Sequence, residues 1–306
     1  MGVIHEEVEI ATLSKGLVLG LKTPEQRIGS SKVTMTTTLE SLLTDRITLP
    51  QRLETLSSIF RAAKPFRHIV IDNMFPDAVL DRLVDEIPTM TADHWVHEND
   101  DHLQKYNLRS AVELGETGFQ LTALLHSAAF LYLLSELTGI WQLLPDPYLQ
   151  GSGYHMIPPG GKFDVHQDRN TAYDTGLSRR LSLIIYLNKN WRPEYGGQFE
   201  LWNSDGTRQE SIVQPLFNRT VIFEIADGNY HGVPRSIACP KGRSRNSFVV
   251  YYHTVGVDGA TEKPPHTSIY APSFYGQNKS VLRKIVKDVT PPIALRALKQ
   301  VIKRKK

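Results

Sequence analysis

From about Tyr148 onward the sequence is divided into short β-rich runs, and this spacing most limits the possible folds. The runs are separated by Gly, Pro, Asn and Asp: GSGYHMI, KFDVHQD, RRLSLIIYLN, GGQFELWN, ESIVQPL, RTVIFEI and RNSFVVYYHT. They do not alternate with helical patterns, so they predict an antiparallel sandwich or barrel and not β-α-β units. Because helical patterns come earlier in the chain, the predicted fold class is α+β with one β core.

The sequence before the β-rich half predicts helices and one strand. Residues 42–63 read as a helix that is interrupted near Pro50, because proline disfavours helix in the residue before it. PFRHIVIDNMF predicts a strand that leads into a turn, and PDAVLDRLVDEIP predicts an amphipathic helix with Pro76 at its start and Pro88 as its stop. We expect four parts: a weakly structured segment (1–40), a helical support region with the first core strand (41–147), the β core (148–256) and a C-terminal extension (257–306).

One uncharged stretch has the length of a membrane span. Residues 117–135 carry no formal charge, although Gln120 and His126 lie among them. The strongest apolar positions recur at three- and four-residue steps: Leu121, Leu124, Leu125, Ala128 and Tyr132. This periodicity is typical of a half-buried helix. A core helix is therefore preferred to a transmembrane helix, which usually needs ~20 apolar residues.

Cysteine content and the start of the chain bear on the compartment. Cys239 is the single cysteine, which excludes an intramolecular disulfide framework and a cysteine-based zinc site. The first residues lack the basic start and apolar run of a signal peptide. We expect a reducing, cytoplasmic location, with peripheral attachment to a membrane as an alternative that depends on the C-terminal residues.

Basic residues are concentrated at the C-terminus. Residues 279–306 contain ten Lys or Arg and one acid, Asp288, a local net charge of +9 in a chain of net charge +3. A helix in PPIALRALKQVIKRKK could dock its apolar face on the body of the protein or lie on an anionic membrane surface. Binding to nucleic acid through phosphates is the third interpretation, and it is not expected because no recognised motif accompanies the charge. The sequence leaves the oligomeric state open.

His166 and Asp168, two residues apart in VHQDRN, are the first candidate metal ligands. In an extended segment both side chains leave the same face. A third imidazole from a distant strand would complete a two-His-one-carboxylate triad, which leaves three positions open and suits non-haem Fe(II). His231 is the best candidate, because DGNYHGVPRS follows the apolar run TVIFEI. An isolated HxD is weak evidence, since chance makes it common and a solvated strand edge is the preferred explanation when it stands alone.

Two further histidine-rich or basic patterns bear on ligands other than metal. DHWVHENDDH is interpreted as a polar loop that could border a substrate pocket, in preference to a second metal site. Arg245 and Ser247 share one face of the strand predicted in RNSFVVYY, where a guanidinium and a hydroxyl can hold a carboxylate. Tyr186 lies on the face of its strand opposite Leu183, and its phenol could donate to the same carboxylate. Taken singly, a surface arginine and a core tyrosine are the alternatives.

The chain from about Gly151 to Thr254 resembles the prolyl 4-hydroxylase-like branch of the Fe(II)/2-oxoglutarate-dependent dioxygenase superfamily. The matching pieces, in the order in which that family has them, are HQD, IIYLNKNW, GGQFELW, HGV and RNSFVVYY. The resemblance implies a double-stranded β-helix (jelly roll) core flanked by N-terminal helices. It also implies decarboxylation of 2-oxoglutarate to succinate, with oxygen activated at iron. The implied cofactors are Fe(II), 2-oxoglutarate and O2, and ascorbate is a further candidate.

The resemblance also assigns roles to residues at matching positions. His166, Asp168 and His231 match the iron ligands. Arg245, with Ser247 beside it, matches the residue that binds the far carboxylate of 2-oxoglutarate, Tyr186 matches a tyrosine that assists it, and Phe199 matches an apolar residue against the cosubstrate. Met156 stands where some relatives have another tyrosine, and Tyr154 is the expected substitute. Because related halogenases lack a carboxylate at position 168, Asp168 favours hydroxylation or another oxidation.

The sequence does not identify the substrate, because relatives that share this machinery act on many compounds. A prolyl residue of a protein, a small metabolite and a glycan-type precursor are all candidates. We expect substrate contacts in HENDDHLQKYNLRS, RNTAYDTGLSRR and WRPEYGG. A polar or anionic substrate would suit four residues near the candidate iron site: Arg169, Asn170, Arg179 and Arg180. The alternative function is a non-catalytic jelly-roll module that binds a ligand or sugar, which would have no reason to keep all three ligands and Arg245.

Overall fold

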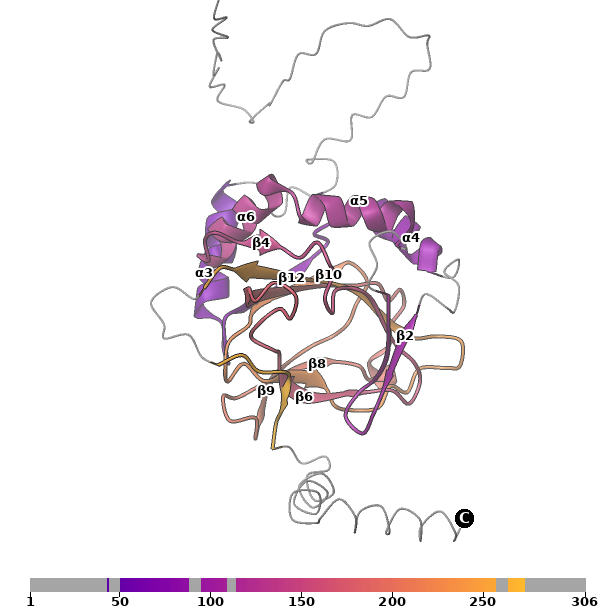
Figure 1. Ribbon diagram of the computed structural model, residues 1–306. Helices are drawn as coiled ribbons and strands as arrows, with labels where there is room; N and C mark the ends of the chain where they lie inside the picture. The colour runs from indigo at the N-terminus through magenta and orange to yellow at the C-terminus, as the bar shows by residue number, and fades with distance from the viewer. Residues whose placement is uncertain (1–42, 44–49, 88–94, 109–113, 257–263, 273–306) are drawn as a thin grey trace, which may run out of the picture. The chain divides into compact units, whose positions relative to one another are not determined.

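The computed structural model describes residues 43, 50–87, 95–108, 114–256 and 264–272 (Figure 1). The chain divides into two compact units between Thr36 and Thr37, and every described residue belongs to the second unit. The predictions for residues 1–40 and for the basic residues 279–306 therefore lie outside the described residues.

Two antiparallel sheets form the β part of this unit. The larger sheet contains, in spatial order, β1 (His68–Asp72), β10 (Arg219–Glu224), β7 (Ser178–Tyr186), β12 (Arg245–Thr254), β5 (Gly153–Ile157), β3 (Gln104–Leu108) and β2 (Val96–Asn99), with β4 (Leu144–Pro145) also paired to β12. The smaller sheet contains β13 (Ile269–Tyr270), β6 (Phe163–Gln167), β11 (His231–Val233), β8 (Phe199–Trp202) and β9 (Gln209–Val213). Each β-rich run identified in the sequence contains one of these strands, so the prediction of an antiparallel β core is confirmed.

Helices cover one face of the larger sheet (Figure 1). They are α3 (Pro50–Ala62), α4 (Asp77–Glu86), α5 (Gly115–Leu125) and α6 (Ala128–Thr138), and a 3-10 turn, η4 (Pro193–Tyr195), lies between β7 and β8. As predicted, α4 follows Pro76, and Asp77 in its first turn interacts favourably with the helix dipole. Leu80 from α4, Phe130 from α6 and Phe248 from β12 are fully buried in one hydrophobic cluster. This cluster fills the helix-facing side of the sheet and leaves the other face for the site.

The uncharged stretch predicted as one core helix forms two helices. α6 begins after Ser127, whose hydroxyl accepts a hydrogen bond from the Phe130 backbone N–H at 3.2 Å. This N-cap breaks the helical phase, so Leu121 is buried whereas Tyr132, expected on the same face, is 61 % exposed. Within the described ranges no single helix has the length and hydropathy to cross a membrane; α5 and α6 taken together, bent by 56°, pass that test by length and composition.

The stretch DHWVHENDDH (93–102) was predicted as a polar loop, but its residues 96–99 form β2, which pairs with β3 in a hairpin. The Asp100 carboxylate accepts hydrogen bonds from the backbone N–H groups of His102 and Leu103, at 2.7 and 2.9 Å, and so closes the turn. These strands are rich in Asn, His and Gln, which do not mark a strand in the sequence. The hairpin forms because β3 pairs with β5, an interaction between distant segments.

Candidate metal centre and the cavity beside it

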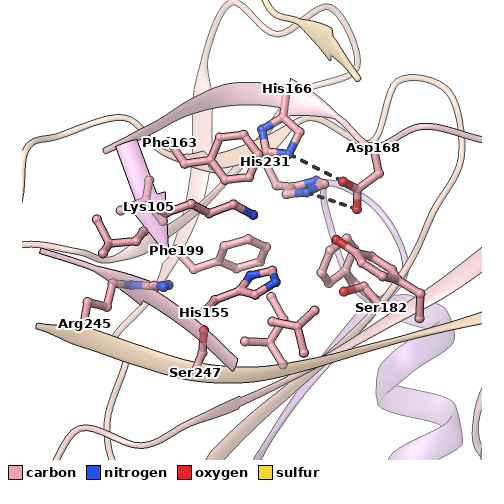
Figure 2. A pocket seen from close by; sticks show the side chains of 17 residues that line it. Lys105, His155, Phe163, His166, Asp168, Ser182, Phe199, His231, Arg245 and Ser247 are labelled. Carbon is pink, nitrogen blue, oxygen red and sulfur yellow. Dashed lines mark ion pairs between the residues drawn. The ribbon is translucent and has the colours of Figure 1, made fainter. Parts of the chain in front are cut away.

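Strand pairing in the smaller sheet brings the predicted metal ligands together. β6 and β11 run antiparallel with His166 directly opposite His231, and Asp168 follows just after β6. The Asp168 carboxylate oxygens lie 3.5 Å from Nε2 of His166 and 3.6 Å from Nε2 of His231 (Figure 2). One candidate ligand atom from each residue lies within 4.8 Å of the others. The three side chains could therefore hold one metal ion.

Backbone carbonyls fix the orientation of both imidazoles. Nδ1 of His166 lies 2.8 Å from the carbonyl oxygen of Asp164, and Nδ1 of His231 lies 3.0 Å from that of Asn229. Because a carbonyl oxygen can only accept, each Nδ1 carries the proton and each Nε2 keeps its lone pair for the centre. Nε2 of His166 and Oδ2 of Asp168 are buried and have no hydrogen-bond partner among the residues that the structure describes. Such atoms are costly to leave unpaired, so the arrangement fits a bound cation.

The electrostatics keep the ligands in the charge states that a metal requires. Burial alone would raise the pKa of Asp168, but His166, His231 and Arg179 outweigh it and hold this pKa well below its usual range. Burial also lowers the pKa of His231 to about 4, so its imidazole is neutral at pH 7. Two imidazoles and one carboxylate suit Fe(II) with open coordination positions. The residues present therefore fit iron.

Gly232 permits the close approach of the two ligand-bearing strands. A Cβ at this position would lie 2.8 Å from Cα of Val165 and 3.0 Å from the carbonyl oxygens of Phe163 and Asp164. These neighbours are backbone atoms, which cannot move aside as a flexible side chain can. The glycine after His231 therefore sets the spacing between β11 and β6 on which the triad depends.

A buried arginine lies at the opposite end of the same cavity from Asp168 (Figure 2). Arg245 is 4 % exposed, and its Nε donates to the carbonyl oxygen of Gly197 at 2.7 Å. Burial lowers its pKa, and no carboxylate among the described residues forms an ion pair with it. A buried guanidinium without an anionic partner is unfavourable. The cavity therefore favours a ligand that carries a carboxylate at this end.

Most of the predicted site residues line this one cavity, which has a volume of about 60 Å³. They are His166, Asp168, Phe199, His231, Arg245 and Ser247. Tyr186 lies on the same face of β7 as the lining residue Ser182, and its ring centroid is 4.9 Å from the Arg245 guanidinium carbon. The buried Tyr186 hydroxyl makes no hydrogen bond within the described part of the chain. Tyr186 therefore stands where it could donate to the same carboxylate.

The prediction for Tyr154 is wrong, because β5 presents its other face to the cavity. His155 and Ile157 line the cavity and are paired with Ser247 and Arg245 on β12. Tyr154 points to the helical side, where its hydroxyl donates to the Leu83 carbonyl oxygen at 3.5 Å. The prediction placed position 154 correctly on one face with Met156 but assigned that face to the wrong side of the sheet.

The sequence did not predict that His155 and Lys105 lie in the cavity. Nε2 of His155 lies 2.8 Å from the carbonyl oxygen of Gly151, and the Lys105 ammonium points into the cavity, 5.0 Å from the ring centroid of Phe163 (Figure 2). His155 lies directly across from Ser247. Only the register between β5 and β12 reveals that neighbour, and Lys105 enters from the hairpin that the sequence did not indicate.

An open cleft of about 790 Å³ adjoins the inner cavity and shares Lys105, Phe163, Asp168 and Tyr251 with it. Two of the three stretches expected to contact substrate reach this cleft, through residues such as Asp100 and Arg179. The third, WRPEYGG, does not line the cleft, because Trp191 is buried in a separate apolar cluster.

Two of the four residues expected to suit an anionic substrate do not line the cleft. The Asn170 amide donates to the Pro264 carbonyl oxygen at 3.1 Å, and the buried Arg180 donates to the Thr254 hydroxyl at 3.3 Å. Both side chains tie loop and strand segments together. Arg169 and Arg179 do line the cleft.

The chain matches a known family over the segment that carries this site. Residues 150–253 match the family model of the 2OG-Fe(II) oxygenase superfamily. This segment contains all three candidate ligands and Arg245. It is a 2OG-Fe(II) oxygenase domain, and the protein is a 2-oxoglutarate-dependent oxygenase that uses Fe(II) and 2-oxoglutarate. The alternative of a non-catalytic binding module is thereby set aside.

Several solved structures are similar to this chain. A prolyl hydroxylase from Trichoplax adhaerens, in complex with a hypoxia inducible factor peptide, is 17 % identical with a TM-score of 0.49, and the match covers 66 % of this chain and 91 % of that one. A prolyl-4-hydroxylase from Pseudomonas putida is 19 % identical with a TM-score of 0.46, covering 65 % and 99 %. HygX from Streptomyces hygroscopicus, with nickel and 2-oxoglutarate bound, is 12 % identical with a TM-score of 0.45, covering 66 % and 92 %.

Proposed function

We propose that this protein hydroxylates an unactivated C–H bond of a small molecule or a protein residue, at iron bound by His166, Asp168 and His231. The observation that carries the proposal is the convergence of three ligand side chains, two of them with unpartnered buried atoms, in one cavity with an unpaired buried arginine. The two facing sheets would then be the layers of a double-stranded β-helix supported by α3 to α6. A prolyl residue stays among the candidate substrates.

Fe(II) with 2-oxoglutarate supplies the oxidising chemistry: O2 is consumed, 2-oxoglutarate is converted to succinate and CO2, and one oxygen atom enters the substrate C–H bond. The residues of this chain supply binding and orientation. His166 and His231 would bind the metal through Nε2, whose direction their Nδ1–H···O=C hydrogen bonds fix. Asp168 would be the third protein ligand and would add a negative charge.

The far end of the cavity would hold the second carboxylate of 2-oxoglutarate. Arg245 supplies a guanidinium that can pair with it. Ser247, which lines the same cavity, and Tyr186, whose ring lies against the Arg245 guanidinium, would add hydrogen bonds through their hydroxyls. The rings of Phe199 and Phe223 line the walls and exclude water from the space between the two ends. The cosubstrate is thereby oriented with its keto acid end toward the triad.

Anaerobic titration of the metal-free protein with Fe(II), followed by 2-oxoglutarate, tests the proposal by visible absorption. We expect a weak charge-transfer band that requires both additions. Asp168→Ala should abolish the band, whereas Asp205→Asn, at an exposed turn between β8 and β9, should retain it. A band of equal strength in Asp168→Ala, or no band in the unmodified protein, would refute the assignment.

A further inference from the structure

Two arginines of the open cleft are each stacked on a tyrosine ring. The guanidinium carbon of Arg169 lies 3.9 Å from the ring centroid of Tyr173, and that of Arg179 lies 3.8 Å from the ring centroid of Tyr251. Both arginines line the cleft together with Asp168. Such stacking holds each planar guanidinium in one orientation. The two cations are therefore positioned in advance beside the metal ligands.

The backbone brings these arginines close together. The segment from Arg169 to Arg180 folds back on itself, with the Arg179 N–H donating to the Asn170 carbonyl oxygen at 2.8 Å. Both guanidinium groups line the same cleft, so the two cations repel each other. Holding like charges together is unfavourable unless an anion lies near both.

No carboxylate of the described residues forms an ion pair with Arg169 or Arg179. Arg179 is only 5 % exposed, and one Nη donates to the Gln150 carbonyl oxygen at 2.8 Å. Its buried Nε has no hydrogen-bond partner in the described part of the chain. A buried guanidinium in this state resembles Arg245 at the far end of the inner cavity. Each arginine site is therefore short of an anion.

The acidic side chains of the cleft are engaged elsewhere. The Glu98 carboxylate lies 3.7 Å from the Lys105 ammonium, and that of Asp100 accepts backbone hydrogen bonds within its turn. The Asp174 carboxylate accepts a hydrogen bond from the Gln150 amide. Asp168 also lines the cleft and attracts both arginines, but its charge would be taken up by the metal ion that it would bind. With that ion in place, a bound molecule would have to supply the anion for the two arginines.

We propose that the substrate carries an oxyanion group, a carboxylate or a phosphate, which Arg169 and Arg179 bind at the mouth of the cleft while the target C–H bond lies over the triad. This inference rests on the proposed function, because the cleft adjoins the proposed iron site through Asp168. Two guanidinium forks match the oxygens of either group. The site is separate from that of the 2-oxoglutarate carboxylate, since Arg245 lies across the inner cavity from Asp168 (Figure 2).

The test uses the full chain loaded with Mn(II) and saturating 2-oxoglutarate, with inorganic phosphate and acetate as separate probes. Paramagnetic relaxation of the phosphate 31P signal or the acetate methyl 1H signal reports an anion bound near the metal. We expect saturable relaxation by at least one probe, and the probe that responds identifies the group as phosphate or carboxylate. Saturation with 2-oxoglutarate keeps the anions from the Arg245 end.

Arg169→Gln and Arg179→Gln should each weaken the responding anion at least about tenfold, because each removes a charge-assisted hydrogen bond. Arg169 is only half-buried, so its variant provides the comparison if Arg179→Gln does not fold. Arg208→Gln, whose side chain is 73 % exposed and pairs with Glu210, is the matched control and should bind as the unmodified protein does.

Relaxation that both cleft variants leave unchanged would mean that the anion binds elsewhere, for example directly on the metal, and would overturn the proposal. Absence of relaxation with both probes would overturn it as well. Failure of Mn(II) to bind before any anion is added would contradict the proposed function, and with it this inference. The metal-loading step thus separates the two failures.

Discussion

Arg245→Gln is expected to abolish most 2-oxoglutarate affinity without destabilising the free protein. The guanidinium is 4 % exposed, lacks a carboxylate partner among the described residues and is disfavoured by burial. Removing one partner of a buried, hydrogen-bonded charge pair costs about 2–5 kcal/mol. The dissociation constant for 2-oxoglutarate should therefore rise by roughly 30-fold to several thousandfold, at about 1.4 kcal/mol for each factor of ten.

The stability of the protein without 2-oxoglutarate should not fall in this variant, because a buried charge that lacks a carboxylate partner among the described residues is replaced by a neutral side chain. Its free energy of unfolding should stay equal or increase, despite the loss of the 2.7 Å hydrogen bond from Nε to Gly197. With Mn(II) present, 2-oxoglutarate at a hundredfold excess over its dissociation constant should stabilise the unmodified protein by about 2.7 kcal/mol. At the same concentration, a variant with a hundredfold weaker site should gain only about 0.4 kcal/mol.

Urea unfolding with and without 2-oxoglutarate measures both effects. Ser247→Ala is the comparison variant: it lies on the same strand face and removes one hydrogen bond to the carboxylate but no positive charge, so its affinity should fall less than that of Arg245→Gln. If Arg245→Gln binds 2-oxoglutarate within about threefold of the unmodified protein, the guanidinium does not hold the cosubstrate and the reasoning fails.

Three further outcomes are expected. Gly232→Ala should reduce Mn(II) affinity at least tenfold, as followed by Mn(II) electron paramagnetic resonance, because its Cβ would lie 2.8 Å from the Val165 backbone; unchanged affinity would show that β11 can shift without moving His231. Chelator treatment should lower the midpoint of thermal unfolding, and restored Mn(II) at a hundredfold excess over its dissociation constant should return about 2.7 kcal/mol; an identical midpoint in both states would rule out a site specific to the folded protein. Phe248→Ala, at a fully buried position, should lower the free energy of unfolding by about 3–5 kcal/mol. Phe119→Ala, at 58 % exposure, should change it by less than about 0.5 kcal/mol, and equal losses would contradict the burial assigned to Phe248.

The sequence predicted the elements whose signals are local. Alternation along a strand placed Tyr186 opposite Leu183, and the structure puts Leu183 in the helix-facing core and Tyr186 beside Arg245. The two-residue spacing of His166 and Asp168 likewise placed both on one face. The apolar periodicity of residues 117–135 predicts one helix, but Ser127 acts as an N-cap and divides the stretch into two.

What the sequence could not provide is which strand lies beside which. The sequence predicted Tyr154 in the cavity, and this prediction failed. The face that β5 turns toward the cavity depends on its register with β12, and register is a property of the folded pair. The β2–β3 hairpin is polar and is stabilised by pairing with β5, so no local pattern indicates it. Lys105, whose ammonium enters the cavity from that hairpin, was missed for the same reason.

The positions of the unpaired arginines explain how one fold can keep two anions apart. Arg245 is the first residue of β12 and faces the enclosed cavity. Arg169 comes from the segment that joins β6 to β7, Arg179 is the second residue of β7, and both face the open cleft. Asp168 lies between these regions and lines both. A cosubstrate anchored at Arg245 and a substrate anchored at the paired arginines would therefore meet at the triad from different sides. Their anionic groups would not compete for one cation, and the loop that carries Arg169 could change its substrate contacts while β12, which carries Arg245, stayed unchanged.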